Sequence, residues 1–475
     1  MKRREFLLST GGVFAAALAA NGTSRATPWL LKKFSGLGAQ ANTTNVWFTH
    51  SMRLDRGRLV GNTLLNTPGF VGCADLKTGQ CTLLDVPLFG HEVIQNPIDP
   101  AILFTSEKWG LFAALIDFKS RKIIAKIENG KGRRFFGHAQ FALDGQSVYS
   151  SEMNDHTGEG VVVQRDLKTG LILNEFSSGG VLPHQLRWIR GGNSLAVMNY
   201  AEGFLNPLEI DSNPHDFHRP VAPEKRAPSS DASTDPSHRS SHRSSLGRPE
   251  TRVAKYPAAA RLAGGSKLTV LTLDAHGALG ETESRLTAHP SLFHFDWDST
   301  TDLFFASGNF ELSAASLASA LAAPDSPAQA SANIASSPHT QSALEVLAPA
   351  DFAPTGQVLS SAQNPATPAK IFDFARAGDG GFLGEALSVA ACPGRSHVAV
   401  SLPESKSLLV WDWAMDRLVQ VERFSDVTRG VVFTDPETLI LTVGPELRVF
   451  KHRRDRWIEN RRFPAGSGSH LTLGV

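Results

Sequence analysis

The chain has 475 residues, and its 47 Lys and Arg against 46 Asp and Glu give a net charge of +1. Since 41% of the residues are hydrophobic and 41 more are Gly, the chain can bury a large core. The near-zero charge argues against a protein that binds nucleic acid through its phosphates. Three cysteines exclude a disulfide framework and a four-cysteine metal site, and no apolar run reaches the ~18 residues of a spanning helix.

The first 20 residues have the composition of an export signal. The stretch KRREFLL at residues 2–8 puts a basic start directly before apolar residues and resembles a twin-arginine signal. Ala-Leu-Ala at residues 17–19 fits a small-x-small cleavage site. We therefore predict a twin-arginine signal peptide over residues 1–20 and a periplasmic location. Because this pathway exports folded proteins, it favours a bound cofactor without identifying it.

Two stretches differ sharply in composition from the rest. Residues 211–265 are rich in Ser, Pro, Arg and His, and residues 312–349 are rich in Ala, Ser and Pro. Neither can bury enough apolar area to offset the chain entropy lost on folding, which predicts two disordered insertions. The remainder consists of runs of about four to eight residues rich in Val, Leu, Phe and Thr, separated by turn residues, a pattern typical of an all-β fold.

A repeat emerges when turns and strands are aligned. Asp-Leu-Lys-Thr-Gly occurs at residues 75–79 and 166–170, where Asp can cap the turn and Gly accepts a positive φ. Seven residues that begin similar strands lie about 40 to 55 residues apart once the insertions are set aside: His91, His138, His184, His294, Ser388, Arg429 and His470. The spacing predicts a seven-bladed β-propeller over residues 46–475, closed by a C-terminal strand that completes the first blade.

The residues also carry a resemblance to known propellers. Gly-His at residues 90–91 and 137–138 is followed about 26 to 28 residues later by an Asp-containing turn, which resembles WD40 repeats. More closely, the chain resembles a bacterial family of exported propellers, the domain of unknown function 1513, in the segments GHAQFALDGQSVYSSEMNDHTGEGVV (137–162), LPHQLRWIRGGNSLAVMNYAEG (182–203), SLFHF (291–295) and SLLVWDW (407–413). Members of that family are often encoded beside imelysin-type iron-uptake proteins. The resemblance implies a periplasmic location, a link to iron, and partners among periplasmic iron-uptake or redox proteins.

Histidine fills five of the seven equivalent positions, which a propeller would place around one end of its central channel. Each imidazole could bond within its own blade and pin a loop, as in WD40-like blades, or the five could converge on a metal or ligand; chance clustering is the third alternative. Imidazole suits Fe, Cu, Zn and Ni, so the expected cofactor is iron or another transition metal. Arg429 would favour an anionic ligand such as a porphyrin carboxylate or a metal chelate. Without Cys-x-x-Cys-His, covalent c-type haem is excluded.

Two smaller candidate sites complete the sequence analysis. Glu152, Asp155 and His156 are expected in a loop after a strand, where they could bind calcium or a substrate or simply form a polar surface. Cys73 and Cys81 flank the turn at residues 75–79 symmetrically, which predicts a disulfide across a hairpin after export.

Three functions remain open at this stage. The first is a periplasmic propeller that acts as a binding or scaffold protein in an iron-related uptake or redox system, with a His-lined channel mouth. The second is an exported metal-dependent hydrolase or lactonase that uses Glu152 or Asp155 as its base. The third is a purely structural protein-interaction module. No short catalytic motif such as Gly-x-Ser-x-Gly or His-Glu-x-x-His occurs, which weakens the support for an enzyme.

Overall fold

The computed structural model describes residues 45–50, 52–55, 58–61, 69–130, 132–155, 157–201, 203–204, 262–263, 266–274, 277, 279–287, 292–311, 340–347, 353–354, 370–372, 386–466, 468 and 470–474. All of them belong to one unit of the chain, Asn42–Val475. The predicted signal peptide (1–20) and most of the two predicted insertions lie outside the described residues. Among the described residues, no helix has the length and apolar character needed to cross a membrane.

The described chain is built from antiparallel strands, which confirms the all-β prediction. Its one helical element is the short 3-10 turn η1 (Arg190–Gly192). The sheet that contains both ends of the described chain has the order β32 (Leu471–Leu473), β1 (Asn45–His50), β4 (Gly69–Asp75) and β5 (Cys81–Val86). The next strands along the chain are β6 (Gly90–Gln95), β7 (Ile102–Gly110), β8 (Phe112–Asp117) and β9 (Lys122–Glu128).

The middle of the chain continues the same pattern. A set of consecutive strands follows: β10 (Arg133–Phe141), β11 (Ser147–Asn154), β12 (Glu159–Asp166), β13 (Ile172–Ile189), β14 (Ser194–Ala201), β17 (Lys267–Leu273) and β18 (Leu279–Leu286). Strand β13 belongs to two layers, because its first half pairs with β12 and its second half pairs with β14. Short strands add to this region: β15 (Gly203–Phe204) pairs with β16 (Leu262–Ala263), and β22 (Ala353–Pro354) pairs with β18.

The last third of the chain forms three four-stranded sheets. Their strands are β19 (Leu292–Asp298), β20 (Leu303–Glu311), β21 (Thr340–Leu347) and β23 (Lys370–Phe372); β24 (Ser388–Ala391), β25 (His397–Leu402), β26 (Ser407–Asp412) and β27 (Arg417–Arg423); and β28 (Thr428–Asp435), β29 (Thr438–Val443), β30 (Glu446–Arg453) and β31 (Arg456–Pro464). A separate ribbon joins β2 (Met52–Asp55) to β3 (Arg58–Gly61).

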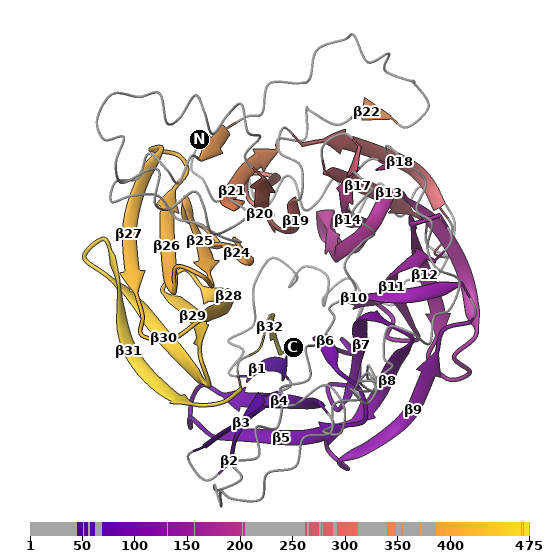
Figure 1. The fold of residues 1–475 in the computed structure, drawn as a ribbon, viewed down its shortest axis with the longest axis horizontal. Helices are drawn as coiled ribbons and strands as arrows, with labels where there is room; N and C mark the ends of the chain where they lie inside the picture. The colour runs from indigo at the N-terminus through magenta and orange to yellow at the C-terminus, as the bar shows by residue number, and fades with distance from the viewer. Residues whose placement is uncertain are drawn as a thin grey trace, which may run out of the picture. The chain divides into compact units, whose positions relative to one another are not determined.

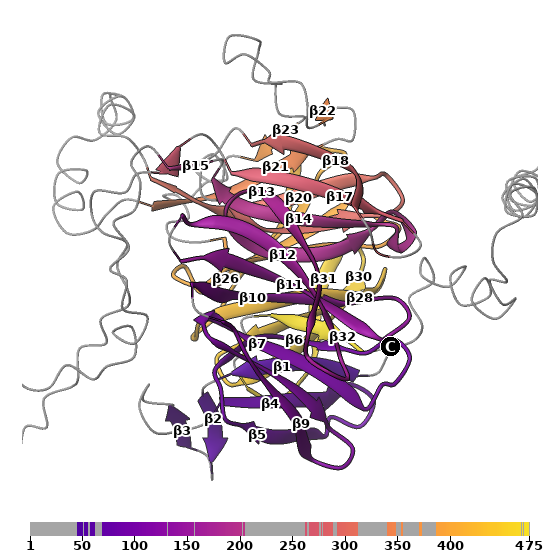
Figure 2. The same cartoon turned by 90° about the vertical axis from the view of Figure 1, so that its right-hand side faces the viewer.

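The sheets are arranged radially around a common axis, which is the architecture of a β-propeller (Figure 1). Strands β1, β6, β10, β19, β24, β28 and β32 lie toward this axis, and the outer strands such as β5, β9, β27 and β31 lie at the rim (Figure 1). In Figure 2, which turns the view by 90°, the strands of successive sheets lie one above another. The innermost strands contact one another in sequence: β1 with β6, β6 with β10, β10 with β13, β13 with β19, β19 with β24, β24 with β28, and β28 with β32.

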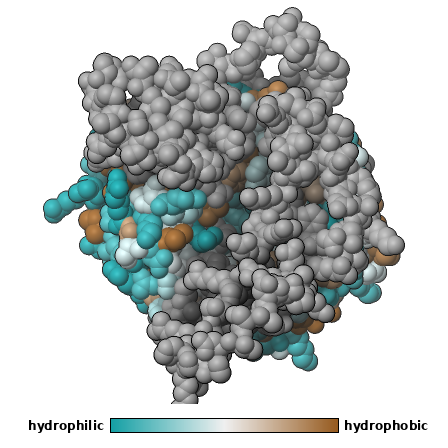
Figure 3. All heavy atoms as spheres, in the orientation of Figure 1, coloured by the Kyte–Doolittle hydropathy of each residue, from teal (hydrophilic) through white to brown (hydrophobic). Residues whose placement is uncertain are grey.

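Neighbouring sheets are held together by hydrophobic clusters between their faces. In one cluster, Val431, Phe433 and Trp457 of the β28–β31 sheet pack against Ala390 and Cys392 beside β24. In another cluster, side chains of β1 and β4 pack against side chains of β29 and β30 from the C-terminal sheet. On the outer side near β27, the visible described residues are mainly hydrophilic (Figure 3). Apolar residues of these sheets therefore pack mainly between neighbouring sheets.

The repeated Asp turns form as the sequence predicts. In the turn at residues 75–79, the Asp75 carboxylate accepts hydrogen bonds from the Lys77 backbone N–H at 2.8 Å and the Thr78 hydroxyl at 2.8 Å. Gly79 has a φ of 78°, in the left-handed region. Asp166 accepts equivalent bonds from Thr169 at 2.7 Å. These bonds lower the pKa of both Asp side chains, because they favour the charged carboxylate.

The predicted Cys73–Cys81 disulfide is wrong for this fold, in which both thiols are free. In the register between β4 and β5, Cys73 lies opposite Thr82 and Cys81 lies opposite Ala74. Directly opposed residues share a face, so the two cysteines point to opposite faces of the sheet. Cys81 packs on the cluster shared with the C-terminal sheet, and Cys73 packs on the cluster shared with β7 and β8. Burial raises the pKa of Cys73 to about 12, which keeps this thiol protonated.

The predicted insertion boundaries also need correction. Residues 340–347, placed in the second insertion (312–349), form strand β21, which pairs with β20 at all eight positions. At the end of the first insertion (211–265), Leu262 and Ala263 pair with β15. Composition cannot reveal these pairings, because the stabilising backbone hydrogen bonds come from a distant partner strand.

Removing β32 should destabilise the fold. Strand β32 pairs with β1, and the Gly474 N–H donates to the Asn45 carbonyl at 2.9 Å. A chain that ends after His470 should lose about 2–4 kcal/mol of unfolding free energy. Strand β1 then keeps β4 but loses β32, and the Leu471 and Leu473 side chains are deleted. Urea unfolding measures the loss. The control Thr472→Ala keeps the strand backbone and should stay within ~0.5 kcal/mol of wild type. An unchanged urea midpoint for the truncated chain would contradict the role given to β32.

Candidate functional site

Five histidines from five separate segments of the chain meet at one place. His91, His138, His184 and His294 belong to β6, β10, β13 and β19, and His470 directly precedes β32. One ring nitrogen from each lies within 4.8 Å of all the others. His184 Nε2 and His294 Nε2 are 3.0 Å apart, as are His470 Nε2 and His91 Nε2. Of the arrangements left open by the sequence, the structure has the convergent one. We call these five residues the histidine cluster.

Irregularities in the inner strands explain why the histidines converge. In four of these strands the pairing register shifts beside the histidine: between Gly90 and Glu92 in β6, Phe135 and Ala139 in β10, Pro183 and Leu186 in β13, and Leu292 and His294 in β19. A β-bulge inserts an extra residue, bends its strand and re-aims a side chain. The bulges therefore allow side chains to leave their own sheets and point at a common centre.

The glycine of the Gly-His dipeptide lies where a Cβ atom would clash with a neighbouring side chain. Gly137 has a φ of 100°, and a Cβ built on it would lie 2.6 Å from Cδ2 of His91. A Cβ on Gly90 would lie 2.2 Å from the Thr105 hydroxyl oxygen. Only glycine therefore lets the backbone of one inner strand approach the imidazole from the neighbouring strand.

A carboxylate orients one ring of the cluster. Glu92 Oε2 lies 3.0 Å from His138 Nδ1; the His138 side chain is fully buried and that of Glu92 is 12% exposed. When His138 Nδ1–H donates to Glu92, the lone pair of Nε2 is available on the other side of the ring. His138 Nε2 is buried and has no hydrogen-bond partner within the described part of the chain. This carboxylate–histidine arrangement is the one that commonly orients metal ligands.

The cluster is kept neutral by its surroundings. His138 and His184 are 0% exposed, His294 is 2% exposed and His470 is 7% exposed. Burial lowers the pKa of all five imidazoles well below its usual value, to about 3 for His138. The positive charge of Lys108 lowers each of these pKa values further. Burial also raises the pKa of Glu92 to about 7. Neutral imidazoles are the form that ligates metals.

Aromatic side chains pack against one side of the histidine cluster. The ring centroids of Phe136, Tyr200 and Phe293 lie 5.9, 5.5 and 5.8 Å from that of His184. Tyr200 stacks on Phe293 at 5.2 Å, and Lys108 Nζ donates to the Tyr200 hydroxyl at 3.4 Å. Sequence reasoning missed Glu92, Lys108 and Tyr200 as site residues. Glu92 could have been suspected, since it directly follows a candidate ligand.

The two equivalent positions without histidine behave differently from each other. The Ser388 hydroxyl accepts a hydrogen bond from the Val431 N–H at 3.2 Å, so it joins two neighbouring inner strands. Arg429 lies at a register shift in β28, and its charge lowers the pKa of His470. The cluster is therefore lopsided, as the sequence predicts, with an arginine in one of the two sectors that lack a histidine.

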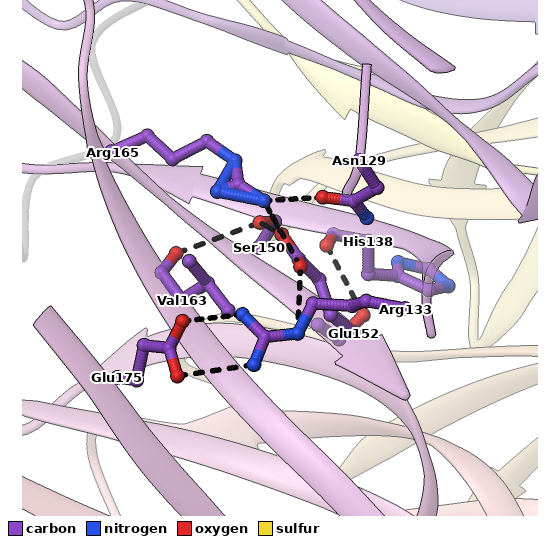
Figure 4. A network of polar contacts seen from close by, with 9 residues as sticks. Asn129, Arg133, His138, Ser150, Glu152, Val163, Arg165 and Glu175 are labelled. Atoms are coloured by element: carbon purple, nitrogen blue, oxygen red, sulfur yellow. Dashed lines mark hydrogen bonds and ion pairs between the residues drawn. The ribbon is translucent and has the colours of Figure 1, made fainter. Parts of the chain in front are cut away.

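The candidate loop site at Glu152, Asp155 and His156 is not supported by the structure. Glu152 is not in a loop: it belongs to β11 and is 0% exposed. Arg165 Nη2 contacts Glu152 Oε1 at 2.8 Å, the Ser150 hydroxyl donates to the same oxygen at 2.7 Å, and Arg133 lies nearby (Figure 4). His156 lies outside the described residues.

The second acid of that candidate site is also committed to a structural ion pair. Asp155 pairs with Arg134 at 2.8 Å, and both side chains are buried. Burial raises the pKa of Glu152 to about 7, and the charge of Arg165 opposes this rise. Glu152 and Asp155 therefore form ion pairs with arginines from neighbouring strands.

One comparison with known proteins matches the segment that contains part of this site. Residues 84–201 match a family model described as a protein of unknown function (DUF1513). That segment is about a quarter of the chain and contains three of the five cluster histidines together with Glu92. No curated protein matches the sequence.

Solved structures resemble the chain in fold at low sequence identity. The crystal structure of RRP9 WD40 repeats has a TM-score of 0.45 at 10% identity and covers 80% of this chain and 82% of that chain. The Kuenenia stuttgartiensis hydrazine synthase has a TM-score of 0.44 at 10% identity and covers 82% and 89%. Likeness at this level carries no argument about ligand or activity.

The buried cluster should make the metal-free protein sensitive to mild acid. The pKa of each imidazole is lower in the folded than in the unfolded chain, so below pH ~6.5 the unfolded chain binds more protons and stability falls. The loss should approach ~1.4 kcal/mol per pH unit for each neutral buried histidine. Urea unfolding of metal-free protein at pH 7.5 and 5.5 measures it. A variant with His184→Gln and His294→Gln should lose less stability between these pH values. An equal loss in wild type and variant would show that the cluster does not cause the acid sensitivity.

Proposed function

We propose that this chain is an exported, periplasmic metal-binding protein: a closed seven-bladed β-propeller that holds a transition-metal ion, with iron the first candidate, in its histidine cluster. The observation that carries the proposal is the set of five imidazoles, four of them buried, whose ring nitrogens lie within 4.8 Å of one another. Imidazole nitrogen is a good ligand for iron, copper, nickel and zinc. Binding or scaffolding within an iron-related uptake or redox system is the role that fits such a site.

Metal binding accounts for a feature that structural hydrogen bonding leaves unexplained. A buried polar atom without a partner costs free energy, so it needs a reason to persist. His138 Nε2 has no partner among the described residues, while Glu92 holds its other nitrogen. Histidines that served only to pin loops would bond within their own sheets. Here the two closest nitrogen pairs, His184–His294 and His470–His91, each join different sheets, and His184 and His294 are 110 residues apart in sequence.

In the proposed structure, a closed ring fixes the distances between ligands from distant parts of the chain. Support for closure comes from the pairing of β32 with β1 and from the packing of the β28–β31 sheet against β1 and β4. His470 and His91 can contact each other only when the two chain ends meet. The periplasmic location and the link to iron rest on the leader sequence and on the family resemblance.

Metal analysis of protein purified after native export tests the proposal. Wild type should carry close to one metal ion per chain, and a variant with His184→Gln and His294→Gln should lose nearly all of it. A matched control changes His397 and His452, an imidazole pair 5.6 Å apart in the two C-terminal sheets, to Gln and should retain the metal. Wild-type protein that takes up no Fe, Co, Ni, Cu or Zn after dialysis against each ion would overturn metal binding and leave a structural interaction module.

Glu92 should strengthen metal binding without touching the metal. Glu92→Gln removes the negative charge that holds His138 Nδ1–H, so the metal affinity should fall about 10- to 100-fold. Competition with a chromophoric chelator measures the affinity. Asp412→Asn is the control, since Asp412 is a buried carboxylate that bonds Ser396 rather than a cluster histidine. Equal affinities for wild type and Glu92→Gln would refute the orienting role of Glu92.

A further inference from the structure

The spacing of the cluster nitrogens contains information about coordination geometry. Two independent Nε2–Nε2 pairs are separated by 3.0 Å, and one ring nitrogen from each of the five residues lies within 4.8 Å of the others. With metal–nitrogen bonds of about 2.1 Å, ligands at right angles lie about 3.0 Å apart and opposite ligands about 4.2 Å apart. In a tetrahedron, every pair of ligands would be about 3.4 Å apart. The two separations of 3.0 Å fit ligands at right angles, as in an octahedron, better than ligands of a tetrahedron.

The number of imidazole nitrogens also favours octahedral over tetrahedral coordination. Structural zinc sites almost always use four ligands, whereas five imidazoles meet here. Five donors on an octahedron leave one position without a protein ligand. Haem does not fit this site: a haem iron leaves only its axial positions to protein ligands, and it could use two of the five rings at most. The ring centroids of His91, His138 and His184 are only 4.6 to 5.2 Å apart, which leaves no room for a porphyrin between them.

The charges around the cluster indicate the ligand for the remaining position. Five neutral imidazoles contribute no negative charge to balance a divalent or trivalent ion. Lys108 donates to Tyr200, whose ring lies 5.5 Å from His184, so a cation and a hydroxyl stand beside the cluster. Arg429 adds a second cation in the sector next to His470. In the described structure, Glu92 is the carboxylate that contacts a cluster histidine. A buried site with this excess of positive charge favours an added anion.

We propose that the cluster holds a six-coordinate metal ion through five imidazole nitrogens and leaves its sixth position to a small exogenous anion. This inference rests on the metal-binding function proposed above. It selects metals that readily adopt six-coordination, such as iron, cobalt, nickel and manganese, over a tetrahedral zinc site. The anion must be small, because four of the five rings are at most 7% exposed.

Cobalt(II) loading followed by azide titration tests this inference on the full mature protein. Bound Co²⁺ should show the weak visible absorption of a six-coordinate ion, and azide should change the spectrum saturably with one equivalent per bound cobalt. Strong absorption typical of tetrahedral Co²⁺, or a spectrum that azide leaves unchanged, would overturn the inference. Because dialysis measures metal content separately, a protein that takes up none of Fe, Co, Ni, Cu and Zn refutes the proposed function, whereas a cobalt-loaded protein that ignores azide refutes only the open position.

A charge variant tests the source of the anion preference. Lys108→Met should raise the azide Kd about tenfold, measured on the fraction that carries Co²⁺. Lys126→Met is the matched control, since Lys126 lies over the Phe112 ring on the outer strand β9 and should leave the azide Kd unchanged. An azide Kd that Lys108→Met does not alter would refute the part of the inference that assigns anion binding to this cation.

Discussion

The register shifts in the inner strands are the constraint on which the site depends. In a regular strand, alternate side chains point to the two faces of the sheet, where the neighbouring sheets pack on them. The extra residue at each bulge turns the histidine out of this alternation and toward the axis. Gly137 makes the same geometry possible from the other side, because its missing Cβ leaves space for His91. Without these local departures, the imidazoles of His91, His138, His184 and His294 would lie between sheets rather than together.

Two kinds of buried polar group are found near the inner strands, and they have different consequences. Glu152 and Asp155 are matched by Arg165, Arg133 and Arg134, so their charges are balanced and they tie neighbouring strands together. A shared hydrogen bond also links this region to the cluster, since the Ser151 hydroxyl donates to the His138 carbonyl at 3.2 Å. The cluster nitrogens, in contrast, are only partly matched. Buried ring nitrogens without hydrogen-bond partners lower the stability of the fold. Such nitrogens are expected in a site that binds a ligand.

Sequence reasoning succeeded where a feature is local. The all-β class followed from short β-rich runs, and the Asp turns formed because Asp75 and Asp166 bond to residues two or three positions away. The same reasoning failed where the partner is distant. The alignment that made Cys73 and Cys81 look symmetric about a turn says nothing about register, and a shift of one residue puts them on opposite faces. Glu152 was assigned to a loop because most of the residues that follow it are polar, whereas its arginine partners, which lie on other strands, bury it in β11.

The sequence by itself determined the all-β class, the repeat and the identity of the five candidate ligands, because each depends on residue type and spacing along the chain. It also suggested that Arg429 breaks the symmetry of the set. Only the tertiary structure decided that the histidines converge, that Glu92 orients His138, and that Lys108 and Tyr200 stand beside the cluster. These facts depend on bulge positions and on contacts between sheets far apart in sequence, and no local pattern encodes the direction in which a bulged side chain points.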